Sequence, residues 1–356
     1  MAPARGGRDR VGSEERALLP PMAGRRGMND QRPSVTVAVC TRERPAQLER
    51  LLRSLAGQVM PPDEILVIDN APVTARTRAL VERAFPTCRY LVEPAQGLDF
   101  ARNRALRESH SEIVAYIDDD AVAEDGWVQG IATVFTGHPR IAICTGRVDA
   151  LSLDTEGARL FEANGGFARG ERRIHLPPGA GALPPGLPRP LIAWSIAVGS
   201  GVSMAVRRSV ALQLGGFDEA LDMGSVLPGG GDLDMLWRVL EASHEVVYEP
   251  AVRARHEHRG ELAAAEIQIL EHNRALIATL TKAVWVAPGV RKLPIVAFLG
   301  WRLCKPLVRL ARRAVGRDPL PAALLARLVV ATWRGLAAYP AATRLAAVRA
   351  GARERT

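Results

Sequence analysis

The stretch Ile113–Ala121, Ile-Val-Ala-Tyr-Ile-Asp-Asp-Asp-Ala, joins two dissimilar halves. The first half is an apolar run with β-branched residues, which is typical of a strand buried at the centre of a parallel sheet. The second half is three consecutive carboxylates, Asp118–Asp120, which repel one another and are costly to desolvate without a partner. A divalent cation such as Mg2+ or Mn2+ at the end of the strand would supply that partner. The alternative interpretation is an acidic turn before a helix.

Strands and helices alternate around this stretch. Apolar runs and helical periodicity predict strands at residues 35–40, 64–68, 89–92, 113–117 and 141–145, and helices at 45–56, 74–84, 97–107 and 126–135. Short links between such elements predict a right-handed, mostly parallel α/β sheet with flanking helices. Ligands of such sheets bind beyond the carboxyl ends of the strands, so Asp69 and Asp118–Asp120 are expected to meet in one cleft.

Two later segments interrupt this alternation. Residues 149–190 are rich in glycine and proline, and a loop of that length is expected to cover a ligand. Residues 191–206 carry no charge, which fits either a membrane span or a buried strand. The many serines and glycines in this second segment favour the strand.

Two further positions are candidates for chemistry. Asp232 follows three consecutive glycines, and either it or Asp234 could cap a helix, while the other serves as a general base. His256, in the run His256-Glu257-His258, could ligate a metal or contact a phosphate. The alternative is an inert surface histidine pair.

Bulk composition narrows the class of protein. The 356 residues are 47% hydrophobic, which suffices for a full core. The four cysteines form no Cys-x-x-Cys pair, which argues against a zinc site or disulfide framework and fits a reducing cytosol. Residues 1–34 are rich in arginine, glycine and proline without an apolar core, so we expect a disordered basic segment and no signal peptide.

The positive charge is concentrated at the C-terminal end. Residues 283–356 hold 14 basic and 2 acidic residues, whereas residues 35–282 hold 26 basic and 32 acidic residues. This distribution predicts an anionic surface partner for the tail and no nucleic-acid groove in the core. The tail also shows apolar residues and tryptophans at helical spacing, which predicts basic amphipathic helices at a membrane surface. Packing of these helices on the catalytic part or on a second subunit is the alternative.

Taken in order, these motifs resemble family 2 glycosyltransferases with the GT-A fold, a Rossmann-like architecture, over Val35–Arg259. The matching elements are Val37–Leu55, Ile65–Asn70 (I-L-V-I-D-N), Gly97–Asn103 (G-L-D-F-A-R-N), Asp118–Asp120, Gly215–Phe217, and Gly230–Arg238 followed by His256. The resemblance implies a GT-A domain at residues 35–260. Residues 261–356 are then a helical, membrane-associating C-terminal region.

The resemblance also implies roles for individual residues. Thr41, Arg42 and Arg44 would begin the nucleotide pocket, and Asp69 would contact the base of the nucleotide. Further matches are the nucleotide-diphosphate pair Arg102 and Asn103, the D-x-D residues Asp118 and Asp120, the catalytic base Asp232, and the metal or diphosphate ligand His256. In this interpretation Asp118 faces the nucleotide, Asp120 binds Mg2+ or Mn2+, and Asp119 is structural. The family commonly has Glu-Asp where this chain has Gly231-Asp232, so the acidic partner of the base is missing.

The implied reaction is inverting transfer of a hexose-like sugar from a nucleoside-diphosphate sugar to an acceptor hydroxyl. The acceptor would be a glycan, a lipid-linked molecule or a small molecule in cell-envelope polysaccharide, glycolipid or secondary glycoconjugate synthesis. The implied location is cytoplasmic, peripheral on the inner face of the plasma membrane. Two alternatives remain: a nucleotidyltransferase, against which the lack of a glycine-rich loop after the first strand counts, and an inactive nucleotide-sugar-binding scaffold.

Overall fold

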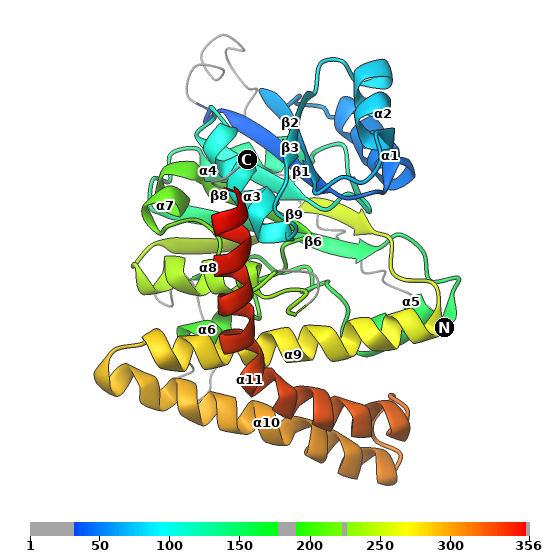
Figure 1. Cartoon of the computed structure of the whole chain (residues 1–356), viewed down its shortest axis with the longest axis vertical. Coiled ribbons are helices and arrows are strands. Elements are labelled where there is room, and N and C mark those ends of the chain that lie inside the picture. Colours follow the sequence, from blue (N-terminus) through cyan, green and yellow to red (C-terminus); the bar gives the residue numbers. More distant parts are fainter. Residues whose placement is uncertain (1–31, 177–189, 223–225, 354–356) are drawn as a thin grey trace, which may run out of the picture. The chain divides into compact units, whose positions relative to one another are not determined.

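The strand β1 (Val35–Thr41) lies inside the sheet because six of its seven side chains are buried. It pairs in parallel with β2 (Glu64–Asn70) on one side and with β4 (Ile113–Ile117) on the other. A further parallel strand, β3 (Arg89–Glu93), pairs with β2 and ends this half of the sheet (Figure 1). The first four strands therefore form the parallel sheet that the sequence predicts.

The other half of the sheet is mixed. β8 (Ser203–Arg207) runs antiparallel to both β4 and β6 (Ile141–Ala150). β9 (Glu245–His256) is parallel to β6, and it also pairs with the short antiparallel strands β5 (Ala121–Ala123) and β7 (Ile174–Leu176). The strand order is β3-β2-β1-β4-β8-β6-β9-β5, with β7 beside β9. The long β9 thus brings residues near 256 back beside the aspartate triplet.

The computed structural model of this chain describes residues 32–176, 190–222 and 226–353. The predicted disordered segment therefore lies outside the described residues except for its last three positions. Residues Pro33–Thr356 form one compact unit.

Apolar side chains of the strands alternate between two helical layers. One face packs on α1 (Pro45–Ala56), α2 (Arg76–Ala84) and α4 (Trp127–Phe135). The opposite face packs on α3 (Leu98–Glu108), α7 (Arg208–Gln213) and α8 (Gly231–Glu241). Because successive residues of a strand point to opposite faces, both layers share the same strands.

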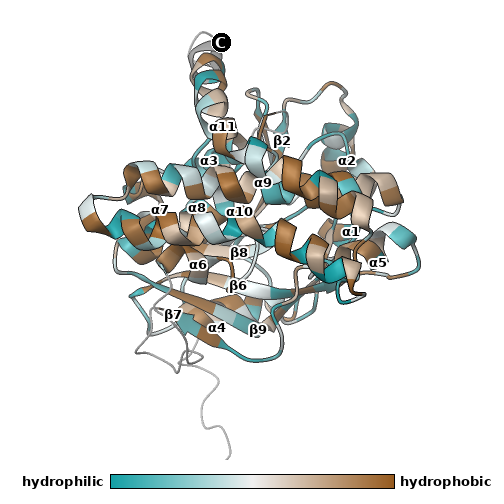
Figure 2. Cartoon of the chain, turned by 90° about the horizontal axis from the view of Figure 1, so that it is seen from below, coloured by the Kyte–Doolittle hydropathy of each residue, from teal (hydrophilic) through white to brown (hydrophobic). Residues whose placement is uncertain are grey.

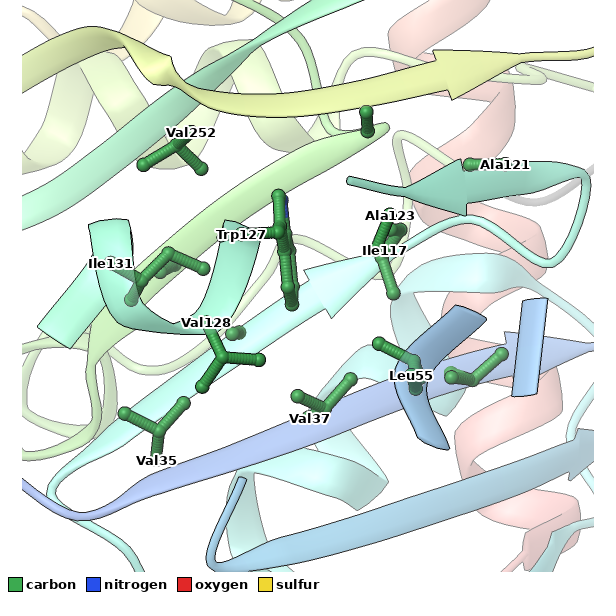
Figure 3. Close-up of a cluster of buried hydrophobic side chains, with 14 of the residues drawn as sticks. Val35, Val37, Leu55, Ile117, Ala121, Ala123, Trp127, Val128, Ile131 and Val252 are labelled. Carbon is green, nitrogen blue, oxygen red and sulfur yellow. The ribbon is translucent and has the colours of Figure 1, made fainter. Parts of the chain in front are cut away.

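Trp127 is the largest side chain of the first layer. Figure 3 shows its ring among Val37, Ile117 and Val128, and the whole residue is inaccessible to solvent. Its indole nitrogen donates a hydrogen bond of 2.9 Å to the hydroxyl of Ser203 on β8. Replacing such a buried aromatic residue by alanine costs about 3–5 kcal/mol of folding free energy. Trp127 therefore holds α4, which follows the aspartate triplet, firmly against the sheet.

Three long helices follow β9. They are α9 (Leu262–Val286), α10 (Lys292–Ala314) and α11 (Ala322–Arg353), with the short turn η1 (Gly289–Arg291) joining the first two. In Figure 1, α9 and α10 run side by side and α11 turns up toward α3, where Arg349 donates to the carbonyl of Gln96 at 2.5 Å. α9 packs on α8 and on α5 (Glu156–Ala163).

The uncharged segment 191–206 divides into two elements. α6 (Leu191–Ser195) comes first, a loop follows, and β8 begins only at Ser203. The prediction of a single buried strand was therefore correct for the last four residues alone. In the described part of the chain, one helical stretch, Ala322–Arg349, is long and apolar enough to cross a membrane, and 28% of its apolar window is buried.

Candidate active site

The aspartate triplet forms the turn between β4 and β5. The amide of Asp118 donates to the carbonyl of Val202, and the amide of Ala121 donates back to the carbonyl of Asp118 at 3.0 Å. The carboxylate of Asp119 points away from those of Asp118 and Asp120. The stretch is therefore an acidic turn, but one whose side chains face different partners.

The middle carboxylate of the triplet points into the protein. Asp119 accepts hydrogen bonds from the hydroxyl of Thr41 at 2.7 Å and from Arg44 at 3.1 Å. Burial raises the pKa of Asp119 to about 6, although the charge of Arg44 opposes the shift. These contacts tie the end of β1 to the end of β4, which makes Asp119 an organising residue of the turn.

Asp118 and Asp120 lie together with His256. One carboxylate oxygen from each aspartate and one ring nitrogen of His256 lie within 4.8 Å of one another. The register of the sheet explains this, because Ala121 of β5 is paired with His256 of β9. Burial alone would raise the pKa of Asp120, but the hydrogen bond and charge of His256 and the charge of Arg44 hold it below its usual value.

A chain of hydrogen bonds fixes the ring of His256. Its Nδ1 lies 3.0 Å from Nδ1 of His258, and Nε2 of His258 lies 2.7 Å from Glu162 on α5. A carboxylate accepts the proton of His258 Nε2, so the other nitrogen of that ring accepts from His256 Nδ1. The remaining nitrogen, Nε2 of His256, lies 3.1 Å from a carboxylate oxygen of Asp120, to which its N–H donates. A divalent cation that replaces this proton would meet the lone pair of Nε2. Two carboxylates and such a lone pair fit a divalent cation such as Mn2+.

Arg102 of α3 is surrounded by carboxylates. Its guanidinium bonds Asp99 at 3.0 Å and Asp222 at 3.3 Å, and it lies 3.9 Å from Asp118. Burial raises the pKa of Asp222 to about 7, even though Arg102 opposes the shift. A single buried cation thus links α3 to the triplet and to the loop before α8.

Asp232 lies in the first turn of α8. Its carboxylate accepts hydrogen bonds from the backbone amide of Gly201 at 2.6 Å and from that of the next residue, Leu233, at 2.8 Å. Asp234 is arranged quite differently, because it is fully buried between Arg238 at 2.7 Å and Lys282 at 2.6 Å. Neither aspartate caps the helix with its side chain, since the cap residue is Gly230. Asp234 is held in the core, whereas Asp232 faces the cleft.

The space beside Asp232 is filled by a residue from another helix. A Cβ built on Gly231 would lie 1.7 Å from Oδ2 of Asp99, so no side chain fits at position 231. That Asp99 oxygen is buried without a hydrogen-bond partner in the described part of the chain. A carboxylate from α3 therefore stands where the family pattern places the side chain before Asp232.

Two adjoining cavities, together called the acidic cleft here, collect these residues. One cavity of about 310 Å³ is lined by Arg102, Asp118 and Asp232. The other, of about 360 Å³, is lined by Thr41, Arg42, Arg44 and the whole triplet. The two share Leu98 and Asp118 as a common wall. One carboxylate of the triplet thus borders both spaces.

Three of the predicted site residues do not line this cleft. His256 reaches it only through its contact with Asp120, and the other two lie elsewhere. Asp69 ends β2 inside the protein, where it accepts a hydrogen bond of 2.7 Å from the hydroxyl of Tyr90. Asn103 uses its amide group on Phe217 and Glu219, with distances of 2.8–2.9 Å. Asp69 thus links β2 to β3, whereas Asn103 holds the loop around Phe217.

Sequence reasoning missed four residues that the fold adds to the site. They are Asp99, Glu162, Asp222 and His258. The sequence held two signals for them. Gly231 stands where the family commonly has a glutamate, so an acidic side chain from elsewhere was to be expected. His258 follows His256 by two residues. Asp222 and Glu162 stand in loop-rich segments whose partners lie 96 or more residues away.

The sheet, the triplet and the cleft define a glycosyltransferase-like α/β architecture, and comparison with known proteins gives the family. The family model described as "Glycosyl transferase family 2" matches residues 36–213. This match covers half of the chain, and the chain therefore belongs to glycosyltransferase family 2.

The curated relatives are distant, and each matches this chain over less than half of its own length. A pre-mycofactocin glycosyltransferase of Mycobacterium tuberculosis is 26% identical over 230 residues, which is 64% of this chain and 43% of that protein. The succinoglycan biosynthesis protein ExoM of Rhizobium meliloti is 33% identical over 101 residues, 26% of this chain and 32% of that protein. The chain thus spans less than half the length of these relatives.

A solved structure shows the same fold. It is described as mannosyltransferase PcManGT from Pyrobaculum calidifontis in complex with GDP-Man and Mn2+. The TM-score is 0.52 at 22% identity, over 89% of this chain and 87% of the other. This likeness supports the GT-A architecture that the sequence predicts.

Proposed function

We propose that this protein is an inverting glycosyltransferase that moves a sugar from a nucleoside-diphosphate sugar to an acceptor hydroxyl. The observation that carries the proposal is the shared cavity of Asp118 and Asp232, with Asp120 and His256 beside Asp118. One member of the candidate metal-binding group and a carboxylate held only by backbone amides therefore border the same cavity. Family membership and the GT-A fold support the same reaction.

The residues divide the work of the reaction. Asp232 takes the proton of the acceptor hydroxyl, whose oxygen attacks the anomeric carbon from the face opposite the leaving nucleotide. The configuration at that carbon is inverted through an oxocarbenium-like transition state. Asp118, Asp120 and His256 would hold Mg2+ or Mn2+, which offsets the charge on the leaving diphosphate when bound.

The residues at the end of β1 are assigned to the donor. Thr41, Arg42 and Arg44 line the second cavity, where Arg44 at 3.0 Å from Asp120 stands next to the metal-binding group. We assign the nucleotide to this cavity and the transferred sugar to the shared wall at Asp118. Arg102 sits in the first cavity as the cation nearest to the leaving diphosphate. Asp69 and Asn103 then support the nucleotide pocket indirectly, through Tyr90 and Phe217.

The relatives indicate the kind of product. One is described as an amylovoran biosynthesis glycosyltransferase, AmsE of Erwinia amylovora, 26% identical over 31% of this chain and 42% of that protein. We propose cell-envelope polysaccharide, glycolipid or secondary glycoconjugate synthesis as the setting for this chain.

A screen of nucleotide sugars with Mn2+ tests the donor assignment. A specific donor stabilises the folded state by mass action, so the melting temperature rises with donor concentration. Release of a nucleoside diphosphate, measured by coupled assay, identifies sugar transfer, whereas release of pyrophosphate would identify nucleotidyl transfer. Stabilisation by nucleotide sugars without release of either product would favour an inactive scaffold.

We also propose that the C-terminal helices contact a membrane surface on the cytoplasmic side. Several large apolar residues on and near α10 are exposed, and Figure 2 shows brown stretches along α10 and α9. The most exposed on α10 are Leu293 at 67%, Val308 at 57% and Trp301 at 53%. Exposed tryptophan and aliphatic side chains on one helix suit the interfacial region of a bilayer.

The arrangement of α10 changes the expected mode of membrane contact. The sequence predicts that its cations face an anionic surface, but Arg302, Lys305 and Arg309 line an internal cavity. The first part of α11 packs on the protein, where Leu324 and Leu325 are buried. Contact with lipid would therefore rest on the apolar side chains of α10 and on its exposed Arg312 and Arg313, and not on the cations that line the cavity.

Vesicle sedimentation tests this surface. Replacing Trp301 and Val308 by serine is expected to reduce co-sedimentation with phosphatidylglycerol vesicles several-fold. Replacing Val59 and Val73, exposed at 70% and 80% elsewhere on the protein, serves as the matched control. Equal sedimentation of both double variants and the unchanged protein would contradict a lipid contact through α10.

A further inference from the structure

A third cavity, of about 240 Å³, adjoins the acidic cleft on the side away from the triplet. It shares several residues with the cavity of Asp232 and none with the cavity of Thr41 and Arg44. The shared residues are Asn164, Gly166, Arg169, His272 and Leu276. The three cavities therefore follow one another in series, with Asp232 in the middle one.

Cations line this third cavity, which is called the basic cavity here. Arg302, Lys305 and Arg309 come from one face of α10, at a spacing of three and four residues, and Arg169 comes from the loop after α5. Arg309 has a carboxylate partner, because it binds both oxygens of Asp318 at 2.7 and 2.9 Å.

The other three cations have no carboxylate partner in the described part of the chain. Arg169 donates only to the backbone carbonyls of Gly166 and Ala168, each at 3.2 Å. Arg302 and Lys305 stand 5.8 and 5.4 Å from the centre of the Trp301 ring. Nε of Arg302 is buried and has no hydrogen-bond partner among the described residues.

Burying these three cations together is unfavourable for the charged forms of their side chains. Burial lowers the pKa of Arg302 to about 10 and that of Lys305 to about 8, and neighbouring arginines add to both shifts. Burial also lowers the pKa of Arg169. Asp318 partly offsets this loss of solvation for Lys305, and Asp232 and Glu162 partly offset it for Arg169, but none of these carboxylates forms an ion pair with the cation. A multivalent anion in the cavity would supply a direct counter-charge.

We propose that the basic cavity binds a phosphate or diphosphate group of the acceptor substrate. The proposal rests on the proposed glycosyl transfer, since it assigns the middle cavity to the reaction and its far side to the acceptor. The donor diphosphate belongs at the opposite end, beside Asp118 and Asp120. Three unpaired cations match the double charge and several acceptor oxygens of a phosphate ester better than a single carboxylate.

The same chemistry has two possible sources. A lipid phosphate could reach the cavity from the apolar outer side of α10, where Trp301 and Val308 are exposed. A soluble sugar phosphate could enter through the acidic cleft. The headgroup chemistry is the same in both cases, so the experiment compares one probe of each kind.

The test uses the full chain and calorimetric titration in EDTA, where the acidic cleft without metal repels anions. The probes are farnesyl phosphate, glucose 1-phosphate and, as an uncharged control, farnesol. The test variant is R302Q with K305Q. The matched control is R312Q with R334Q, which removes two cations that are exposed and lie outside the cavity.

Farnesyl phosphate is expected to bind the unchanged protein and the control variant, and to bind R302Q with K305Q at least tenfold more weakly. The same pattern with glucose 1-phosphate instead supports the site with a soluble acceptor. The proposal would be overturned if neither phosphate binds, or if the phosphate binds all three proteins equally. Binding of farnesol as tight as that of farnesyl phosphate would also overturn it.

Two further measurements keep folding and donor binding separate. The test variant removes mutually repelling buried cations, so its melting temperature without ligand is expected to equal or exceed that of the unchanged protein. Its stabilisation by a nucleotide sugar with Mn2+ should be unchanged. A protein that binds farnesyl phosphate but no nucleotide sugar would overturn the glycosyl-transfer proposal and support the anion site. A protein that binds a nucleotide sugar but neither phosphate would overturn the anion site alone.

Discussion

The acidic cleft and the basic cavity are neighbours, but they treat buried charge in opposite ways. In the cleft, Asp119 and Asp120 share Arg44, and Asp99 and Asp222 share Arg102. In the basic cavity, Arg302 and Lys305 have no described carboxylate partner. Buried charges without partners cost stability, so their presence marks a place where a ligand supplies what the chain omits.

The difference also separates two ways of building a site. The cleft is organised by the protein itself, because each carboxylate is held by a cation, an amide or a histidine before any substrate arrives. Such preorganisation suits groups that must act on a transition state. The basic cavity has the right charge but few internal bonds, which suits a site that holds a distant part of a substrate.

The largest expected effect concerns the base. Asp232→Asn should reduce sugar transfer about 10²–10⁴-fold, because a general base contributes a factor of that size. Binding of the nucleotide sugar, measured by thermal shift, should stay unchanged. Asp125→Asn, which alters an exposed aspartate, is the control. Retained transfer in Asp232→Asn would remove the base from this position, and Asp234 is no substitute because Arg238 and Lys282 hold it in the core.

Loss of the metal-binding group should have a comparable effect on turnover. Asp120→Ala removes one carboxylate of the group formed with Asp118 and His256. We expect loss of the Mn2+-dependent stabilisation by donor and loss of Mn2+-dependent transfer. Normal metal dependence in this variant would contradict the D-x-D assignment.

A substitution at Gly231 should disturb the packing between α3 and α8. Gly231→Glu places a side chain on Oδ2 of Asp99, and overpacking of this kind costs about 1–3 kcal/mol. Urea unfolding should show this loss of stability. Adding Asp99→Gly should recover most of it, because the new carboxylate then occupies the vacated space. A double variant as unstable as Gly231→Glu alone would show that the two positions do not exchange roles.

A smaller effect is expected behind the metal-binding group. His258→Ala removes the acceptor that orients His256, and loss of such a partner typically weakens metal binding about 10–100-fold. Electron paramagnetic resonance of free Mn2+ measures the affinity without any reaction. Glu162→Gln should give a weaker effect in the same direction, while His175→Ala, beside Glu245, should leave the affinity unchanged.

The smallest effect is a pH dependence in the basic cavity. Lys305 is faced by Arg302 and Arg309 on its own helix, by Asp318 beyond that helix, and by Arg169 and His272 across the cavity. Burial and the two arginines on α10 lower the pKa of Lys305 to about 8 in the folded protein. The positive form is therefore present below that pH and is lost above it.

Binding of farnesyl phosphate should accordingly weaken by up to about tenfold per pH unit above pH 8, since binding must then be accompanied by uptake of one proton. The phosphate itself stays doubly charged there, because its second pKa is about 6. Titrations at several pH values in the K305Q variant should lack this dependence. A profile identical in both proteins would assign the titration to another group.

Much of the fold could be predicted from the sequence because it depends on local patterns. The apolar runs of β1 and β4 mark buried strands, and their ends mark the ligand side of a parallel sheet. Thr41, Arg44, Asp118 and Asp120 meet for this reason. Asp69 and Asn103 are placed in the nucleotide pocket by resemblance. In the structure Asp69 binds Tyr90 of β3 and Asn103 binds the loop around Phe217. No local pattern reveals the direction of a side chain at a strand end or on a helix.

The sequence by itself determined the strands of the parallel half of the sheet, the position of the aspartate triplet at the end of β4, and Asp232 after three glycines. Only the tertiary structure decided that Asp99 fills the space beside Gly231 and that α10 turns Arg302, Lys305 and Arg309 toward the basic cavity. Periodicity tells which residues share a helix face, but not which face a neighbouring element covers. That choice depends on contacts between residues far apart in the chain, such as α10 with the loop after α5, and these contacts exist only in the folded protein.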